Sequence, residues 1–173
     1  LKSSVKYYTF VHRIAKYINL MTIITEHTID TWIERYENEK VYLIDLKLLT
    51  EDQPDLMAFI DQENYTLLTK DEITLMEYLT MIIYHSCSYG QSKLIISGEE
   101  LEKSEEENWN TFNDSKTKNF TKILDTYFEN YPQEDLLALV EDSLQPDEEN
   151  MVTQVGQEII FVACKSIIDT IHR

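Results

Sequence analysis

Glycine and proline each occur only three times among the 173 residues of the chain. Sandwiches, barrels and other turn-rich folds use far more of both, since average proteins contain roughly 7% Gly and 5% Pro. Gly90, Gly98 and Gly156 are also too scattered for a phosphate-binding loop, which needs clustered glycines. Apolar residues at helical spacing fill the chain instead. The sequence therefore predicts an all-α protein, an irregular helical bundle of about 6–7 helices.

Helix-start residues and apolar spacing place the individual helices. Thr69 with Glu72, and Ser97 with Glu100, match the capping-box pattern, in which two side chains bond each other's backbone N–H groups. Pro54 suits the first position of a helix. The helix that begins at Ser97 is expected to break in the polar stretch 113–119. The expected starts of the remaining helices are Thr28, Pro132 and Thr153.

Two of the expected helices, over residues 69–87 and 153–171, leave almost no polar face. Helices that are apolar all round are buried, so these two should pack together at the centre, with amphipathic helices around them. Residues 41–49 are ambiguous, because a short apolar run suits a buried strand as well as a helix. A minor strand over 41–48 is therefore kept as an alternative.

Asp45 is an unusual carboxylate, since it lies within the apolar run 41–49. A buried carboxylate needs a partner or a shifted pKa. We expect Arg35 or Lys47 to pair with it. An acid–base role in catalysis is the alternative interpretation.

The net charge excludes several classes of partner. The chain carries 32 Asp and Glu against 15 Lys and Arg, a formal net charge of -17. Such a chain repels a phosphate backbone, and it lacks the basic stripe that nucleic-acid-binding proteins use. No apolar run approaches the roughly 18 residues that a membrane span requires. We therefore expect no direct nucleic-acid binding and no membrane insertion; the charge suits solubility or a basic protein partner.

The first 25 residues differ from the rest, because they contain no Asp or Glu. Their basic residues are Lys2, Lys6, Arg13 and Lys16. Three interpretations are open: a transit peptide, an extension upstream of a start at Met21, or a basic amphipathic helix whose apolar face is Tyr7, Val11, Ile14 and Ile18. The sharp change in composition favours the extension. This interpretation divides the chain into a basic extension over 1–20 and a single acidic helical domain over 21–173.

Residues of metal-ligating type occur as two pairs at helical spacing. His27 and Asp30 are three positions apart, and so are Asp169 and His172, so each pair would share a helix face. Two such pairs together would supply four ligands to a metal ion. Both pairs lie near helix ends, and this spacing often arises by chance. The sequence therefore predicts no metal and no cofactor, with these four residues as weak candidates.

The two cysteines, Cys87 and Cys164, stand in apolar surroundings, where a thiol is typically structural. His85 is two positions from Cys87, so on a helix the two side chains point about 200° apart and cannot form a catalytic dyad. Cys164 would meet His85 only where the central helices cross. We predict no catalytic residue, and the two cysteines fit a reduced, cytoplasmic protein.

The densest group of acids lies between residues 99 and 107. Acids in the first turn of a helix are favoured by its dipole, which accounts for Glu99 but not for Glu105 and the acids after it. Like charges three or four residues apart repel each other, so the cluster indicates either a solvated face or a docking surface for a basic protein. The residues expected to bind a partner are Glu99, Glu102, Glu105 and Glu106.

The chain contains no specific catalytic motif. The sequence therefore favours a non-enzymatic acidic helical protein that acts through protein–protein interaction. One alternative is a DNA-mimic or immunity-type inhibitor, whose acids would occupy the basic site of a nuclease or DNA-binding protein. A second alternative is an enzyme or metal-binding protein with a site inside the bundle.

Overall fold

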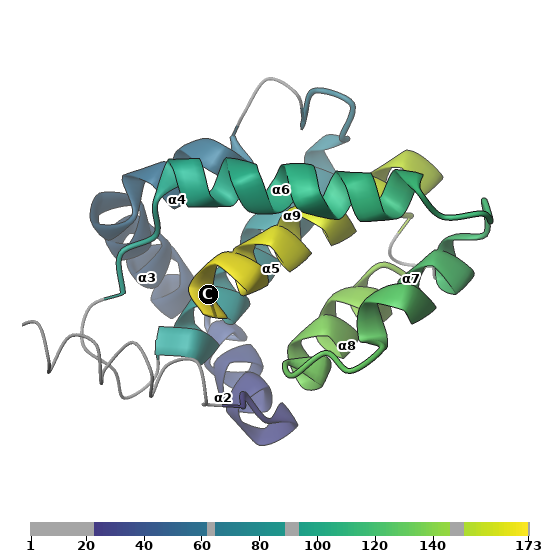
Figure 1. Ribbon diagram of the computed structural model, residues 1–173. Helices are drawn as coiled ribbons and strands as arrows, with labels where there is room; N and C mark the ends of the chain where they lie inside the picture. The colour runs from purple at the N-terminus through teal and green to yellow at the C-terminus, as the bar shows by residue number, and fades with distance from the viewer. Residues whose placement is uncertain (1–22, 62–64, 89–93, 146–150, 173) are drawn as a thin grey trace, which may run out of the picture.

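The computed structural model describes residues 23–61, 65–88, 94–145 and 151–172. These ranges form an all-α bundle, as predicted, and contain no strand (Figure 1). The helices are α2 (Glu26–Tyr36), α3 (Glu39–Asp52), α4 (Pro54–Ile60), α5 (Lys70–Ser88), α6 (Gly98–Asn113), α7 (Phe120–Phe128), α8 (Glu134–Ser143) and α9 (Gln154–His172). Within these ranges, every helix is too short or too polar to cross a bilayer. The basic segment 1–20 lies outside the described residues.

The described ranges contain eight helices, more than the expected number, because the ambiguous run 41–49 is helical. The alternative of a strand over 41–48 is wrong, since this run belongs to α3. The side chain of Asn38 caps α3 by accepting bonds from the backbone N–H groups of Lys40 and Val41. A buried strand would hide all its apolar residues, whereas Ile44 and Leu48 on α3 are more than half exposed.

Helices α5 and α9 form the centre of the bundle, as their composition predicts (Figure 1). They pack against each other, with α6 and α8 against α9 and with α2 against α5. Phe161 of α9 is fully buried, and its ring lies 5.1 Å from that of Tyr127 and 6.0 Å from that of Phe120. These edge-on contacts anchor α7 to the central helix.

The capping box predicted at the start of α5 is confirmed. The backbone N–H of Thr69 donates to Glu72 Oε2 at 2.7 Å, and the backbone N–H of Glu72 donates to Thr69 Oγ1 at 3.2 Å. Helix α2 begins three residues earlier than expected, because Thr25 and not Thr28 is the residue before its first turn. The predicted break in 113–119 is confirmed, since α6 ends at Asn113 and α7 starts at Phe120.

Candidate acidic docking face on α6

Helix α6 carries the acidic cluster, and its start is held by a neighbouring helix. Ser97 precedes the first turn but its side chain makes no capping bond, so the capping box expected from Ser97 and Glu100 does not form. Asp55 of α4 takes its place, because its Oδ2 accepts the backbone N–H of Gly98 at 3.1 Å. This bond fixes the start of α6 against α4 and adds a carboxylate beside the acidic cluster.

A polar seam with α9 sets the rotation of α6 about its axis. The Ser104 hydroxyl lies 2.8 Å from that of Thr170, and Asn108 Nδ2 donates to Ser166 Oγ at 3.1 Å. Buried hydrogen bonds of this kind are costly to break, because each partner would be left unsatisfied. The seam therefore fixes which side of α6 faces solvent.

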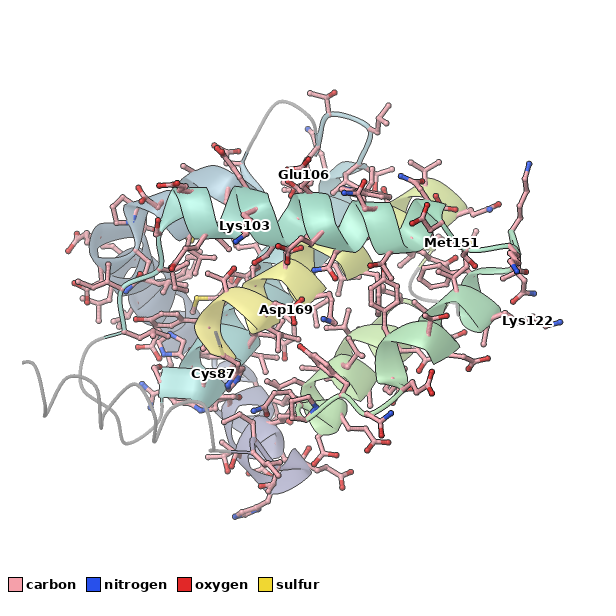
Figure 2. All side chains as sticks on the ribbon, in the orientation of Figure 1. Cys87, Lys103, Glu106, Lys122, Met151 and Asp169 are labelled. Carbon is pink, nitrogen blue, oxygen red and sulfur yellow. The ribbon has the colours of Figure 1, made fainter. Side chains whose placement is uncertain are left out.

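Three of the four predicted docking residues lie on the outward side of α6. Glu99, Glu102 and Glu106 are exposed and follow one another at i, i+3 and i+7, which places them on one helix face. Figure 2 shows Glu106 on the outer side of the helix. We call Glu99, Glu102 and Glu106 the acidic face of α6.

Glu105 lies apart from this face. It is half-buried, and its Oε1 accepts the hydroxyl hydrogen of Tyr65 at 2.9 Å. Burial and the nearby charge of Glu102 raise the pKa of Glu105, and bonds from Tyr65 and Trp109 only partly oppose the rise. Glu105 is therefore turned toward the protein itself, and we place it outside the acidic face.

A pocket of about 380 Å³ lies between α4 and the acidic face. Its carboxylates are those of Asp55, Glu99 and Glu102, and its apolar wall is formed by Ala58 and Phe59. Among the described residues, no lysine or arginine forms an ion pair with any of the three acids. Three carboxylates beside an apolar wall suit the guanidinium or ammonium end of a long basic side chain.

The two candidate metal-binding pairs lie on different helices of the bundle. His27 and Asp30 lie on α2, and Asp169 and His172 lie on α9. Both carboxylate oxygens of Asp169 are 2.6 Å from Lys165 Nζ, and they also accept bonds from Asn108 and Tyr131. In the described ranges, no three His, Cys, Asp or Glu residues are grouped so as to hold a metal ion.

Cys87 has a histidine neighbour that the sequence did not indicate. Its Sγ lies 3.5 Å from His172 Nε2, and His172 Nδ1 lies 3.3 Å from Gln133 Nε2. Cys87 is only 2% exposed, and this burial raises the pKa of its thiol. The thiol is therefore protonated at neutral pH and shielded from solvent, which is opposite to what a cysteine nucleophile needs.

The two remaining candidates from the sequence, Asp45 and His85, each contact a neighbouring side chain in a structural role. Asp45 pairs with Arg35, one of the two expected partners, through a 2.9 Å bond from Nε to Oδ2. The ring of His85 stacks on Trp32, with ring centres 4.8 Å apart, and burial lowers the pKa of His85. His85 is therefore neutral at pH 7 and packs as an aromatic ring.

Comparisons with protein-family models, with curated proteins and with solved structures found no match. Only the geometry and charge of this chain therefore bear on its function.

Proposed function

We propose that the protein acts by binding another protein, and that the acidic face of α6 docks a basic surface of that partner. One observation carries the proposal: Glu99 and Glu102 of the acidic face and Asp55 of α4 line an open pocket, and none of these three acids forms an ion pair with a lysine or arginine of the described residues. An excess of negative charge attracts a positively charged partner and speeds association.

A narrower form of the proposal is an inhibitor that covers the basic site of a nuclease or DNA-binding protein. The regular spacing of Glu99, Glu102 and Glu106 along one rigid helix supports it, since a DNA-binding site recognises a row of regularly spaced negative charges. The proposal places the interaction in the cytoplasm, and the two free, buried cysteines fit that reducing compartment.

Affinity purification from the native host at low salt tests the proposal. The bait proteins are the wild type and a triple variant, Glu99→Gln, Glu102→Gln and Glu106→Gln, which keeps side-chain shape and helix propensity. We expect the wild type to retain a basic protein that the triple variant loses. A control triple variant at the exposed acids Glu34, Glu37 and Glu129, also changed to Gln, removes equal charge elsewhere and should retain the partner. Equal retention by all three baits would refute docking at α6.

A further inference from the structure

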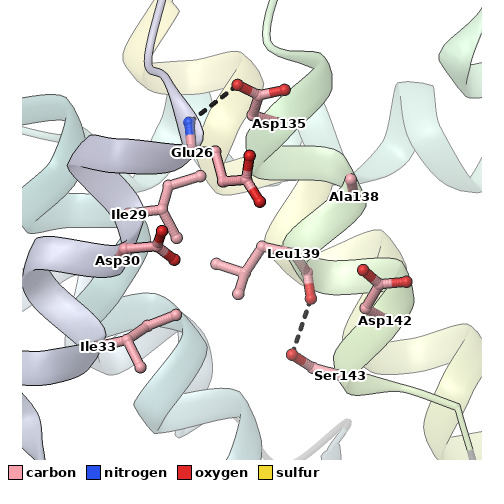
Figure 3. A pocket seen from close by; sticks show the side chains of 9 residues that line it. All are labelled: Glu26, Ile29, Asp30, Ile33, Asp135, Ala138, Leu139, Asp142 and Ser143. Atoms are coloured by element: carbon pink, nitrogen blue, oxygen red, sulfur yellow. Dashed lines mark hydrogen bonds between the residues drawn. The ribbon is translucent and has the colours of Figure 1, made fainter.

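A second acidic groove lies on another part of the molecule, between α2 and α8 (Figure 3). Its volume is about 520 Å³. Its floor is apolar and is formed by Ile29 and Ile33 of α2 and by Ala138 and Leu139 of α8. Ile29 is buried, whereas the other three are partly exposed to solvent. The floor therefore offers apolar surface that a ligand can cover.

Carboxylates rim this floor on both sides. Glu26 and Asp30 belong to α2, and Asp135 and Asp142 belong to α8. All four are exposed, and none is paired with a lysine or arginine of the described residues. Burial and the charges of Asp142 and Asp125 also raise the pKa of neighbouring Glu141, as expected where negative charge is concentrated.

The two walls of the groove are fixed to each other at one end. The backbone N–H of Ile24 donates to Gln133 Oε1 at 2.9 Å, and the backbone N–H of Glu26 donates to Asp135 Oδ2, also at 2.9 Å. Both bonds join the start of α2 to the start of α8. A site held in this way is already formed before a ligand arrives, which lowers the entropy cost of binding.

The shape of the groove selects the backbone conformation of its ligand. The walls are helices of 11 and 10 residues, about 16 and 15 Å long at 1.5 Å per residue. Helical walls offer no strand edge with which an extended peptide could pair. An extended peptide would therefore gain no backbone hydrogen bonds from these walls, whereas an amphipathic helix in a groove brings its own.

We propose that this groove binds a basic amphipathic helix of another protein. The apolar stripe of that helix covers Ile33, Ala138 and Leu139, and lysine or arginine side chains on its two flanks pair with the acids on the two rims. Long basic side chains suit this arrangement, because their stems lie along apolar surface while their charged ends reach the carboxylates. This site is separate from the acidic face of α6, so its test is independent of the test of the proposed function.

A synthetic peptide tests the proposal by fluorescence anisotropy at about 0.15 M salt, where the attraction of distant charges is screened. The probe is a labelled Leu/Lys helix of about 15 residues with leucines at i, i+3, i+4 and i+7. A control peptide keeps every lysine and replaces each leucine by alanine. We expect the full chain to bind the leucine peptide and to bind the alanine peptide at least about tenfold more weakly, because the apolar floor is then left uncovered.

Matched variants locate the binding site. Replacing Asp30 and Asp142 together by Asn should weaken binding about tenfold. Replacing Glu37 and Glu129 together by Gln removes the same charge from exposed positions outside both the groove and the acidic face of α6, and should change affinity less than about twofold. Ala138→Trp fills the groove and should abolish binding, with thermal unfolding used to check that the variant is folded.

Three results with the peptides would overturn the proposal: no binding of the leucine peptide, an equal loss of affinity in the two double charge variants, or full binding by folded Ala138→Trp. Dimerisation of the wild type that Ala138→Trp abolishes would assign the groove to a second copy of this chain and would overturn it as well.

Discussion

Glu72 and Thr153 are 81 positions apart in sequence and are joined by two hydrogen bonds of 2.7 Å. The backbone N–H and the hydroxyl of Thr153 both donate to Glu72 Oε1, while Oε2 accepts the backbone N–H of Thr69. One carboxylate thus holds the starts of both central helices, and it is only 2% exposed. Three predictions about stability depend on this contact, and a fourth concerns the core beside it.

Glu72→Ala should be strongly destabilising. The change removes the charged acceptor of the Thr69 and Thr153 donors, and a hydrogen bond to a charged group contributes about 1.5–3 kcal/mol. We expect the free energy of unfolding to fall by about 3 kcal/mol in urea titrations. The neighbouring exposed residue provides the control, since Asp71→Ala should cost less than about 1 kcal/mol. Similar losses from both variants would contradict the role given to Glu72.

The same contact should make stability depend on pH. Burial disfavours the charge of Glu72, but hydrogen bonds from Thr69 and Thr153 outweigh burial and hold its pKa below the ordinary value of 4.5. A carboxylate with a lowered folded-state pKa stabilises the fold above its unfolded-state pKa, and this stabilisation is lost as pH falls through the folded-state pKa.

Glu72→Gln removes this titratable group. The free energy of unfolding of the variant should therefore fall less than that of the wild type between about pH 5 and about pH 2. Urea titrations across this range measure the difference between the two proteins. A difference that stays constant with pH would show that Glu72 has no lowered pKa.

Gly156→Ala should destabilise the protein, although alanine normally favours a helix over glycine by about 1 kcal/mol. A Cβ on Gly156 would clash with Glu72 Oε1, so the carboxylate would have to leave its bonds to Thr153. We expect a loss of about 2 kcal/mol in the wild type, and a much smaller loss in a Glu72→Ala background, where the clash is gone. Equal effects in the two backgrounds would rule out this clash as the cause.

The cysteine in the middle of α9 should be inert. Cys164 is fully buried, and burial raises the pKa of its thiol to about 12. Labelling of the native protein at neutral pH should therefore be far slower than labelling in urea. Phe161→Ala, in the same helix, should cost about 3–5 kcal/mol, because the buried ring leaves a cavity against Tyr127 and Phe120. Rapid native labelling, or a cost below about 1 kcal/mol, would contradict a packed centre at α9.

Local patterns of the sequence predict capping contacts correctly where both partners lie within one helix turn. The box of Thr69 and Glu72 forms as expected, and Pro54 takes the first position of α4. The same pattern at Ser97 failed, because Asp55 of another helix supplies the acceptor at the start of α6. A local motif thus predicts a helix start well but does not predict which group satisfies it.

The sites depend on contacts between helices, which one sequence does not reveal. The density of acids between residues 99 and 107 indicates the acidic cluster, but the inward turn of Glu105 depends on Tyr65, 40 positions away. The neighbour of Cys87 is 85 positions away, on α9. The groove between α2 and α8 likewise needs the relative placement of two helices that are far apart in the chain.

The central claim is that the acidic face of α6 steers a basic partner into place. The most direct measurement is the association rate constant with the purified partner, by stopped flow, over a series of ionic strengths. For the triple variant Glu99→Gln, Glu102→Gln and Glu106→Gln, we predict a rate at least about tenfold lower at low salt and a much weaker salt dependence, since steering acts through screened long-range charge. The control variant at Glu34, Glu37 and Glu129 should keep most of the wild-type rate. If the α6 variant associates at the wild-type rate with the same salt dependence, the acids of α6 do not dock the partner and the claim is wrong.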